Sequence, residues 1–434
     1  MLLILTPGPS PRQAYAFDLL LGRLLGITWE ITHSEEEFRT FQGPGFCYGK
    51  RAGEALCISP AGLLEEHGIR EQEVEIGIRH GVPVLFPDPD PASDPGFDPF
   101  AAAFYMVSRY EEYLPFDGDA YGRFTSSASI ASRSGFLHLP VVHAWAGLLQ
   151  DALRRRFPGL EGHPPAYRYV PTIDIDHAWA YRGRSFARNM GALGRAAMRA
   201  DMEDIAARLK VLAGRSRDPY DTYDFLEELH AQYGNQPLWF ILHADYGGED
   251  NNVSPGTGAY HALLKRLDRE GRLGIHPSLS SNRSFRRLEE EYGGQCDLLD
   301  RDVNFSRQHF LKFSFPGTFR ALEKLGITDD FSMGYADRAG FRAGIAMPFP
   351  FFDLGRNHVT GLVIHPVSIM DVTLRDYLRL TPDAALEMVH ELIRTVRHAN
   401  GEFVSLWHNE SLSETRRWKG WRRVYMETVR AASA

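Results

Sequence analysis

Two aspartates at the end of an apolar segment have the spacing in this sequence that points most directly to chemistry. Asp174 and Asp176 end a segment that is apolar from Tyr169 onward, and this pattern predicts a short buried strand. Because alternate side chains of a strand point to the same face, the two carboxylates would lie side by side. Carboxylates this close repel each other unless a cation neutralises them, and a bound metal ion would leave one aspartate as ligand and the other as a base. The alternative interpretation is structural, with both aspartates capping the helix that follows.

Several histidines follow other apolar segments in the same way. Strands are expected at 237–243, 273–276, 311–315, 361–365 and 403–408, and four of them end at a histidine: His243, His276, His365 and His408. In a β/α barrel, side chains at the carboxyl ends of the parallel strands gather in one active site. The pattern therefore predicts a barrel with the two aspartates at its mouth. We expect His243 and His365 to be structural.

Five short motifs in this part of the chain resemble those of NodB-type polysaccharide deacetylases, in the same order. They are Thr172-Ile173-Asp174-Ile175-Asp176, Gly274-Ile275-His276-Pro277-Ser278, Ser306-Arg307-Gln308-His309-Phe310, Gly326-Ile327-Thr328-Asp329-Asp330-Phe331-Ser332 and Leu406-Trp407-His408. The resemblance covers about residues 165–425 and is closest to a divergent bacterial branch with its own N-terminal domain. It implies a distorted NodB-like β/α barrel that hydrolyses an N-acyl group.

The resemblance implies a role for each matching residue. Asp174 would be the general base, and Arg307 would orient it. Asp176 and His276 would hold a divalent ion, for which Zn²⁺ is expected because it binds carboxylate and imidazole and lowers the pKa of bound water. His408 would be the general acid that protonates the departing amine.

Two supporting roles come from the same resemblance. The backbone N–H near Phe310 would help to stabilise the oxyanion of the tetrahedral intermediate. Asp330 would support either the acid histidine or Arg307.

The metal site departs from the family pattern at one ligand. The second motif of the family normally has two histidines four positions apart, but this chain has Ser280 at the second position, whereas His309 stands where the third motif has proline. The third ligand would then be His309, a weakly bound Ser280 or Asn282, or water. Because two protein ligands would hold a metal less tightly, a catalytically silent glycan-binding or scaffold protein remains an alternative function.

Other polar residues could contact a substrate. Arg342 could clamp a carboxylate or phosphate through two hydrogen bonds, or could form a structural bridge to Asp353 or Asp337. Asp245 and Tyr246 follow an expected strand end and could line the cleft.

The chain before the barrel predicts a separate domain. Residues 1–165 are expected to form an N-terminal α/β domain of unknown role, followed by the barrel over 166–434. Expected strands alternate with expected helices as in parallel α/β layers, with strands at 2–5, 55–58 and 82–86 and helices at 12–25, 97–113 and 143–157. The polar and aromatic run 108–113 favours an interface with the barrel over a sugar-binding patch.

A basic segment follows the aspartate pair. Residues 181–217 carry nine Lys and Arg against three Asp and Glu, and the apolar spacing predicts an amphipathic helix or pair of helices inserted into the barrel. A solvated lid over the site is the preferred interpretation. The alternatives are peripheral contact with an anionic membrane surface or with a phosphate-bearing substrate.

Composition limits the partners and the location. The 48 Lys and Arg against 56 Asp and Glu give a net charge of −8, which argues against nucleic-acid binding. Three cysteines without a CxxC pair indicate neither a disulfide scaffold nor a thiolate metal site. No apolar run approaches the roughly 18 residues of a membrane span, and the first residues lack a basic signal-peptide start, so a cytoplasmic location is expected.

The expected function is that of a metal-dependent carbohydrate N-deacetylase. Its substrate would be an N-acylated amino sugar or glycan precursor of bacterial surface polysaccharide metabolism, carried by a nucleotide or a lipid. A non-sugar amide hydrolase on the same barrel is a further alternative.

Overall fold

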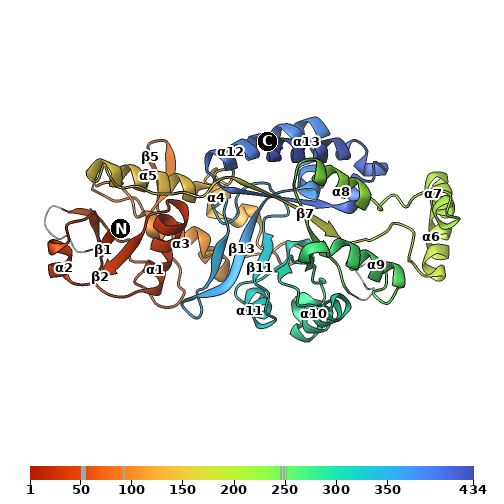
Figure 1. Ribbon diagram of the computed structural model, residues 1–434, viewed down its shortest axis with the longest axis horizontal. Helices are drawn as coiled ribbons and strands as arrows, with labels where there is room; N and C mark the ends of the chain where they lie inside the picture. The colour runs from red at the N-terminus through yellow and green to blue at the C-terminus, as the bar shows by residue number, and fades with distance from the viewer. Residues whose placement is uncertain (50–54, 91–92, 245–246, 248–249, 251) are drawn as a thin grey trace.

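A closed barrel of parallel strands forms the C-terminal part of the protein (Figure 1). The structure is a computed structural model that describes residues 1–434 except 50–54, 91–92, 245–246, 248–249 and 251. Around the barrel the strands are β7 (Arg168–Ile175), β8 (Leu238–Ile241), β9 (Leu273–Ile275), β10 (Phe305–Ser306), β11 (Asp329–Met333), β13 (His358–Met370) and β14 (Glu402–His408). Pairing of β11 with β13 and of β14 with β7 closes the ring. The expected fold class, an N-terminal α/β domain before a NodB-like distorted β/α barrel, is confirmed.

The fourth strand of the barrel does not lie where the sequence predicts it. The segment expected as a strand at 311–315 is a loop in which Leu311 and Phe313 are buried, and the strand is the two-residue β10 before it. Phe310 and Leu311 have φ of 60° and 50°, which breaks an extended conformation. The apolar side chains do alternate in this segment, but they do so in a loop. Phe313 and Phe315 pack on Phe319, at 5.2 and 4.9 Å between ring centroids.

Helices surround the barrel. They are α8 (Tyr223–Gln232), α9 (Gly258–Leu267), α10 (Phe285–Leu299), α11 (Gly317–Lys324), α12 (Pro382–His398) and α13 (Trp421–Ser433). One additional strand, β12 (Phe349–Asp353), pairs antiparallel with β13 outside the ring. Every residue of β12 is buried, because the N-terminal domain packs against it.

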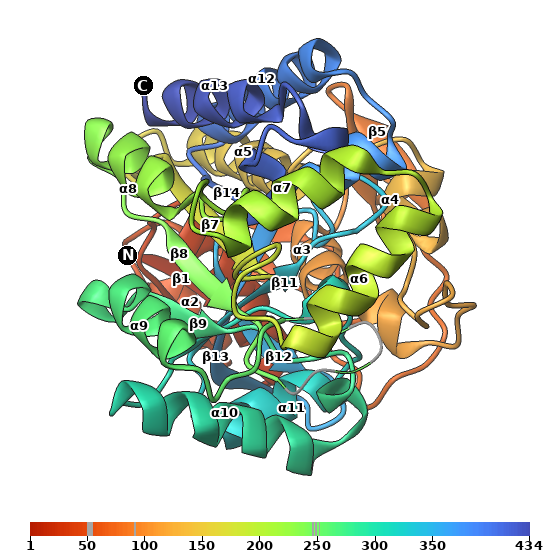
Figure 2. The same ribbon diagram turned by 90° about the vertical axis from the view of Figure 1, so that its right-hand side faces the viewer.

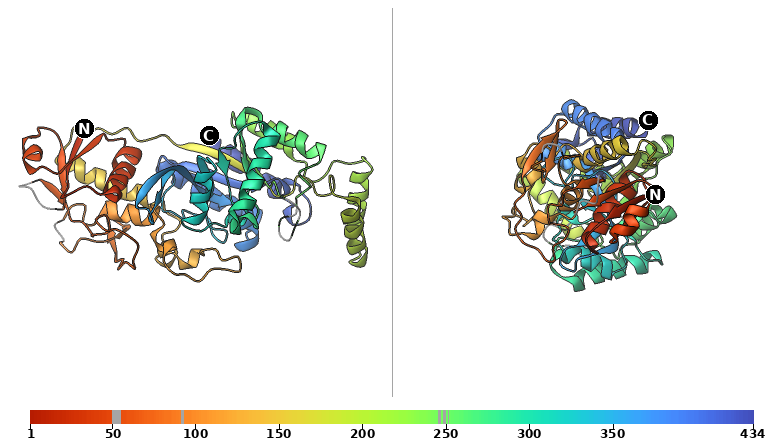
Figure 3. Two further views of the ribbon diagram at one scale, coloured as in Figure 1. Left: turned by 90° about the horizontal axis from the view of Figure 1, so that it is seen from below. Right: turned by 90° about the vertical axis from the view of Figure 1, so that its left-hand side faces the viewer.

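The basic segment after β7 forms two helices, α6 (Phe186–Met198) and α7 (Met202–Leu212). They lie at one end of the elongated molecule, opposite the N-terminal domain (Figures 1 and 3). Figure 2 views that end directly and shows both helices crossing in front of the barrel. Since they follow β7, they lie on the side where the barrel strands end. In the described part of the chain, no helix has the length and apolar character needed to cross a membrane.

The N-terminal domain is built on a parallel sheet of four strands in the order β2-β1-β3-β4. The strands are β1 (Leu2–Leu5), β2 (Trp29–Thr32), β3 (Gly45–Tyr48) and β4 (Leu56–Ile58), and the helices are α1 (Pro11–Phe17), continued by a π-helix to Leu24, α2 (Glu35–Thr40), α3 (Pro99–Val107), α4 (Ile130–Arg133) and α5 (Val141–Arg156).

The segment expected to extend this parallel sheet at 82–86 lies outside it. It forms β6 (Val82–Leu85), which pairs antiparallel with β5 (Ile76–Arg79). Their two-residue connection, His80-Gly81, has positive φ at both positions, the geometry of a tight hairpin turn. Such a turn forces the chain back beside itself.

The two parts of the molecule share one core. Tyr15 and Phe104 of the N-terminal domain pack on Phe352 of β12, with ring centroids 5.1 and 5.0 Å apart. The run 108–113 lies at this boundary, as predicted, because Arg109 donates to the hydroxyl of Tyr335 at 3.1 Å.

Candidate metal centre

Three side chains at the mouth of the barrel bring their ligand atoms together. Asp176 follows β7, His276 follows β9 and His309 lies in the turn after β10, and one atom from each lies within 4.8 Å of the others. The two carboxylate oxygens of Asp176 divide between the imidazoles: Oδ1 is 3.2 Å from Nε2 of His276, and Oδ2 is 3.5 Å from Nε2 of His309. Neighbouring parallel strands end at the same edge, which is why residues 100 positions apart meet here.

The facing atoms of this cluster fit a divalent cation. Among the described residues, Oδ1 of Asp176 and Nε2 of His276 are buried without a hydrogen-bond partner. Such atoms are costly to leave unpaired. Nδ1 of His276 donates to the carbonyl of Arg307 at 2.6 Å, so in the neutral ring Nε2 keeps its lone pair toward the centre. One carboxylate and two imidazoles form a donor set that suits Zn²⁺.

His309 is oriented by a carboxylate behind it. Its Nδ1 lies 2.9 Å from Oδ1 of Asp250, which also accepts the N–H of Leu279 at 3.0 Å. Burial disfavours the imidazolium, but the charges of Asp176 and Asp250 outweigh burial and raise the pKa of His309 to about 9. A cation bound at Nε2 would therefore have to displace a proton.

The other candidates for the third ligand are engaged elsewhere. The hydroxyl of Ser280 lies 2.9 Å from that of Ser278, and Nδ2 of Asn282 donates to the carbonyl of Lys312 at 2.6 Å. The geometry thus favours His309 among the alternatives that the sequence left open.

Asp174 lies beside the cluster and is held by Arg307. Oδ1 accepts from Nη1 of Arg307 at 2.9 Å, and Oδ2 lies 3.9 Å from Nε2 of His276. Arg307 is completely buried, stacks over the ring of Phe240 at 4.6 Å and donates from Nε to the carbonyl of Phe331 at 2.9 Å. One oxygen of Asp174 is therefore fixed and the other faces the centre.

His408 ends β14, where it is paired with Asp174 of β7, and a second carboxylate holds it. Its Nδ1 is 2.8 Å from Oδ1 of Asp371, and its backbone N–H donates to Oδ2 of the same residue at 2.8 Å. Its Nε2 lies 3.7 Å from Oδ2 of Asp176. Burial lowers the pKa of His408, but the charges of Asp371 and Asp176 raise it to about 10.

Asp371 and Asp250 were not among the site residues predicted from the sequence. Asp371 directly follows β13, which is the strand-end position that singled out the other residues, but the strand was expected to end at His365. Asp250 lies in the acidic segment after β8, and only the folded structure brings it to His309.

Asp330 does not support the acid histidine. Its carboxylate accepts from the hydroxyl of Ser306 at 2.5 Å and from the N–H and hydroxyl of Ser332 at 2.9 and 3.0 Å. Burial raises the pKa of Asp330, although the charge of nearby Arg307 opposes this shift. Because β10 and β11 pair Ser306 with Asp330, this carboxylate joins two strands while Asp371 occupies the position behind His408.

Arg342 does not face the metal centre and is not a substrate clamp. Its guanidinium donates to both carboxylate oxygens of Glu112 at 2.9 and 2.5 Å and is 3% exposed. The bridges expected to Asp353 or Asp337 are also wrong, because these carboxylates bind Arg320 at 2.6 Å and Ser126 at 2.6 Å. Arg342 instead joins the barrel to the N-terminal domain.

Phe310 lies at the edge of the site in a left-handed conformation. Its carbonyl accepts from Arg123 at 2.8 Å, and its ring stacks on Tyr121 at 4.9 Å between centroids. Asp245 and Tyr246 lie outside the described residues.

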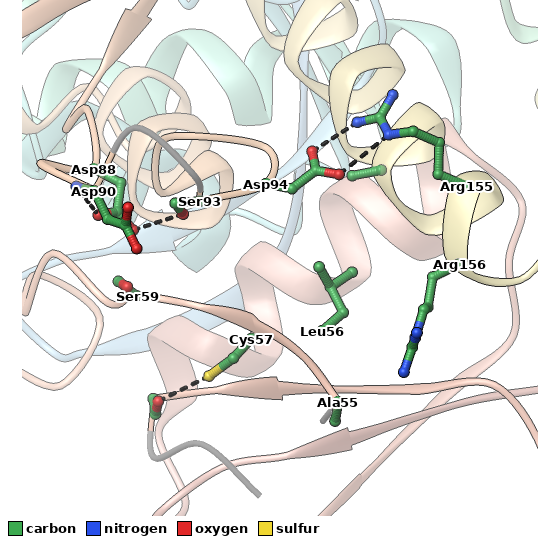
Figure 4. A pocket seen from close by; sticks show the side chains of 12 residues that line it. Ala55, Leu56, Cys57, Ser59, Asp88, Asp90, Ser93, Asp94, Arg155 and Arg156 are labelled. Carbon is green, nitrogen blue, oxygen red and sulfur yellow. Dashed lines mark hydrogen bonds and ion pairs between the residues drawn. The ribbon is translucent and has the colours of Figure 1, made fainter. Parts of the chain in front are cut away.

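A second cavity, of about 630 Å³, lies in the N-terminal domain (Figure 4). Arg155 binds Asp94 at 2.6 Å across it, and the hydroxyl of Ser93 donates to Asp88 at 2.8 Å. Its described lining residues all belong to positions 49–156, so it is separate from the metal centre.

Comparisons with known proteins match the two parts of the chain differently. A family model described as a family of unknown function (DUF7033) matches residues 2–158. No curated protein matches the sequence.

Solved structures resemble the chain only distantly. A Mycobacterium smegmatis protein assigned as a polysaccharide deacetylase has 13% identity and a TM-score of 0.41, over 62% of this chain and 85% of its own. An allantoinase has 9% identity and a TM-score of 0.36 over 63% and 89%. A CE4 family pseudoenzyme from Bacillus anthracis has 12% identity and a TM-score of 0.28 over 61% and 62%. The strand order of the barrel therefore defines the fold, and the metal centre is inferred from the distances between its own residues.

Proposed function

We propose that this protein is a metal-dependent hydrolase that removes an N-acyl group, specifically acetyl, from an amino sugar. One observation carries the proposal: three potential ligand atoms meet beside a fixed carboxylate, Asp174, and a fixed imidazole, His408. Two of the three, on Asp176 and His276, are buried without a hydrogen-bond partner among the described residues. Amide hydrolysis needs a base for the attacking water and an acid for the leaving amine, on opposite sides of the reacting carbon.

The proposed cofactor is Zn²⁺, held by Asp176, His276 and His309. When bound, it would supply a Lewis acid that lowers the pKa of water and polarises the amide carbonyl. Behind the ligands, the carbonyl of Arg307 and the carboxylate of Asp250 fix the two imidazole rings.

Asp174 is the proposed general base. Arg307 occupies Oδ1, so Oδ2 is the oxygen that can take the proton of the attacking water. The guanidinium cannot take up that proton itself, since arginine stays charged in proteins. Arg307 therefore positions the base and holds its orientation through the reaction.

His408 is the proposed general acid. Asp371 holds Nδ1, which directs Nε2 toward the centre. With a pKa of about 10, the imidazole carries a proton at neutral pH and can deliver it to the departing nitrogen.

The proposed substrate is an N-acetylated amino sugar in a precursor of bacterial surface polysaccharide. The motif order of the NodB-type deacetylases supports this substrate class. The catalytically silent alternative rested on the missing histidine at position 280, and the orientation of His309 supports the enzyme instead.

Metal content and acetate release from N-acetylated amino sugars test the proposal together. Wild-type protein is expected to bind about one Zn²⁺ per chain, and Asp176→Asn and His309→Gln are expected to lose it. Ser280→Ala is the matched control, because this side chain lies nearby without facing the cluster, and it should retain metal. A wild type that binds no divalent ion after supplementation would overturn the metal-dependent function. If Ser280→Ala lost as much metal as His309→Gln, the ligand set would be wrong.

A further inference from the structure

A cavity of about 750 Å³ lies beside the metal centre, between α7 and the loops that follow β14. Two of its lining residues are sequence neighbours of the site: His177 follows Asp176, and Glu410 follows His408 by two positions. The proposed reaction uses no residue of this cavity.

Arg184 is the unusual residue of this cavity. In the described part of the chain, no carboxylate pairs with its guanidinium, and its Nε is buried without a hydrogen-bond partner. Burial, together with the positive charges of Arg188 and Arg208, lowers the pKa of Arg184. Asp218 is the carboxylate whose charge acts on Arg184, but it forms no ion pair with the guanidinium in the described part of the chain. A half-buried guanidinium without an ion-pair partner is unfavourable, so this position favours an anion from outside the chain.

The other arginines around the cavity differ from Arg184 because each has a carboxylate partner. The pairs are Arg208 with Asp204 at 3.4 Å, Arg416 with Asp201 at 2.8 Å, Arg417 with Glu410 at 3.0 Å, and Arg217 with Asp224. These pairs hold the walls in place and leave Arg184 as the cation that can receive a ligand.

The walls also offer N–H groups and aromatic faces. Nε1 of Trp418 and Nδ1 of His177 are buried and lack partners among the described residues. The rings of His177 and Tyr220 are stacked, with an interplanar angle of 19°. A planar guanidinium with N–H donors around it binds phosphate oxygens, and aromatic rings cover the apolar face of a sugar or base.

We propose that this cavity binds the phosphate or diphosphate group of the substrate, with Arg184 as its counter-charge. The inference rests on the proposed function, since it makes the substrate an amino sugar linked through phosphate. The carrier beyond the phosphate is either a nucleoside or a lipid.

Binding of inorganic phosphate, measured calorimetrically, tests the subsite without any hydrolysis. Arg184→Gln is expected to weaken binding about tenfold or more. The matched control is Arg182→Gln, which removes an exposed arginine of the same segment whose partner is Asp221 at 3.6 Å, and binding should persist. Binding should also persist in Asp176→Asn, because phosphate held by a metal ion would be lost there. Equal affinity of wild type and Arg184→Gln, or loss in Asp176→Asn, would overturn the subsite whether or not the protein is a deacetylase.

Two larger probes distinguish the carrier. Uridine diphosphate and a short prenyl diphosphate share the phosphate chemistry but differ in the attached group. If one probe binds more tightly than inorganic phosphate and this binding is lost in Arg184→Gln, the attached group of that probe identifies the class of carrier. If neither probe depends on Arg184, the inference is wrong.

A separate observation concerns the outer faces of α6 and α7. In most surface helices the apolar stripe faces the core, but here it faces solvent. Phe186 and Met198 of α6 are each 81% exposed, and Met202 of α7 is 68% exposed. Met190, Leu209 and Leu212 extend these outer faces, while the buried positions of the two helices are Asn189, Ala196, Arg208 and Val211.

Charge indicates what covers this apolar surface. The segment 181–217 has nine basic and three acidic residues in a chain of net charge −8. Exposed Arg195, Arg199 and Lys210 lie among the apolar side chains. Basic residues around an exposed apolar stripe are typical of helices that lie in the interface of an anionic bilayer.

We infer that α6 and α7 dock on an anionic phospholipid surface. Co-sedimentation with vesicles of phosphatidylglycerol and phosphatidylcholine is expected for the full chain, and weaker binding to phosphatidylcholine alone. Phe186→Glu with Met198→Glu should lose most binding, whereas Met426→Glu, which alters an exposed methionine of α13, should keep it. Absence of wild-type binding, or equal binding of the double variant, would overturn the inference. A double variant that instead converts a dimer into a monomer would show that a second copy covers this face.

Discussion

At the scale of single residues, the arrangement centres on the carboxylate of Asp176. Nε2 atoms of His276, His309 and His408 surround it at 3.2, 3.5 and 3.7 Å. Each of these rings is held from behind at Nδ1, by a backbone carbonyl or by a carboxylate. The site is therefore defined as much by Asp250 and Asp371 as by the residues facing the centre.

Asp371→Asn should separate catalysis from metal binding. Without the carboxylate, His408 loses the charge that raises its pKa and the acceptor that fixes its ring. We expect kcat for deacetylation to fall about 100-fold, with metal content unchanged. Steady-state kinetics and metal analysis of the same preparation check this result. Undiminished kcat would remove His408 from the role of acid.

Asp250→Asn and Asp174→Asn should affect different properties, the first metal affinity and the second hydrolysis. Loss of the charge behind His309 should weaken metal affinity about 10–100-fold, measured by competition with a chelator. Asp174→Asn should bind metal as the wild type does and show almost no hydrolysis, because only the base is lost. If both variants lost metal equally, Asp174 would have to be counted as a ligand.

Motif order identified most of this site from sequence alone, because its residues lie at the ends of strands. Asp174 and His408 are among the last two residues of β7 and β14, whereas Asp176, His276 and Arg307 directly follow β7, β9 and β10. His309 remained one of several alternatives, since a histidine in a turn has no periodic pattern that fixes its direction. Asp250 required knowledge of the tertiary fold.

At the scale of elements, the length of β13 explains one error. The sequence predicted that this strand ends at His365, the polar residue after the apolar run. The strand continues to Met370, and its pairing with both neighbours is irregular around Pro366. Asp371 was missed for this reason. Similarly, β10 has two residues, too few to show any alternation.

His365 of β13 links its own strand to β11 and β14, and it should make the free energy of unfolding depend on pH. It lies 2.9 Å from Asp329 of β11 and 2.8 Å from Glu402 of β14. Burial opposes its charge, but these two acceptors raise the pKa of His365 to about 9. Since the folded pKa exceeds the unfolded one, the stabilisation is complete below about pH 6.5 and is lost as pH rises through about 9.

Urea unfolding of wild type and His365→Gln measures this contribution. The free energy of unfolding should be higher for the wild type than for the variant. We expect this difference to be larger at pH 6 than at pH 9.5, by on the order of 2 kcal/mol. A difference between the two proteins that stays constant with pH would show that His365 acts through packing alone.

At the scale of the whole molecule, buried charges connect the two domains. Glu112 binds Arg109 at 2.7 Å within its own domain and Arg342 of the barrel at 2.5 Å. Burial alone would raise the pKa of Glu112, but Arg342 and Arg109 hold it below its usual value. The sequence predicted an interface at the run 108–113, but it did not predict that Arg342 would be the partner of Glu112.

Glu112→Gln should destabilise both domains together. It leaves the guanidinium of Arg342 buried without its counter-charge, whereas Arg109 keeps Glu111 at 2.9 Å, and this costs about 3–5 kcal/mol. Because the core is continuous, we expect one calorimetric transition at a lower temperature, and Arg342→Met added to Glu112→Gln should restore part of the loss. Glu427→Gln, which breaks an exposed pair on α13, should change stability little. Two separate transitions would contradict a shared core.

By covering the apolar strand β12, the N-terminal domain should affect the solubility of the barrel. Its sequence, Phe-Pro-Phe-Phe-Asp, is apolar, and one edge of the strand is paired with β13. The hydroxyl of Tyr15 donates to the carbonyl of Pro350 at 2.9 Å, from the domain that also covers the rings. A barrel cut away at residue 165 would present this apolar strand to other chains, and uncovered strands of this kind recruit one another into aggregates. We therefore expect the N-terminal domain to keep the barrel from self-association by covering this strand.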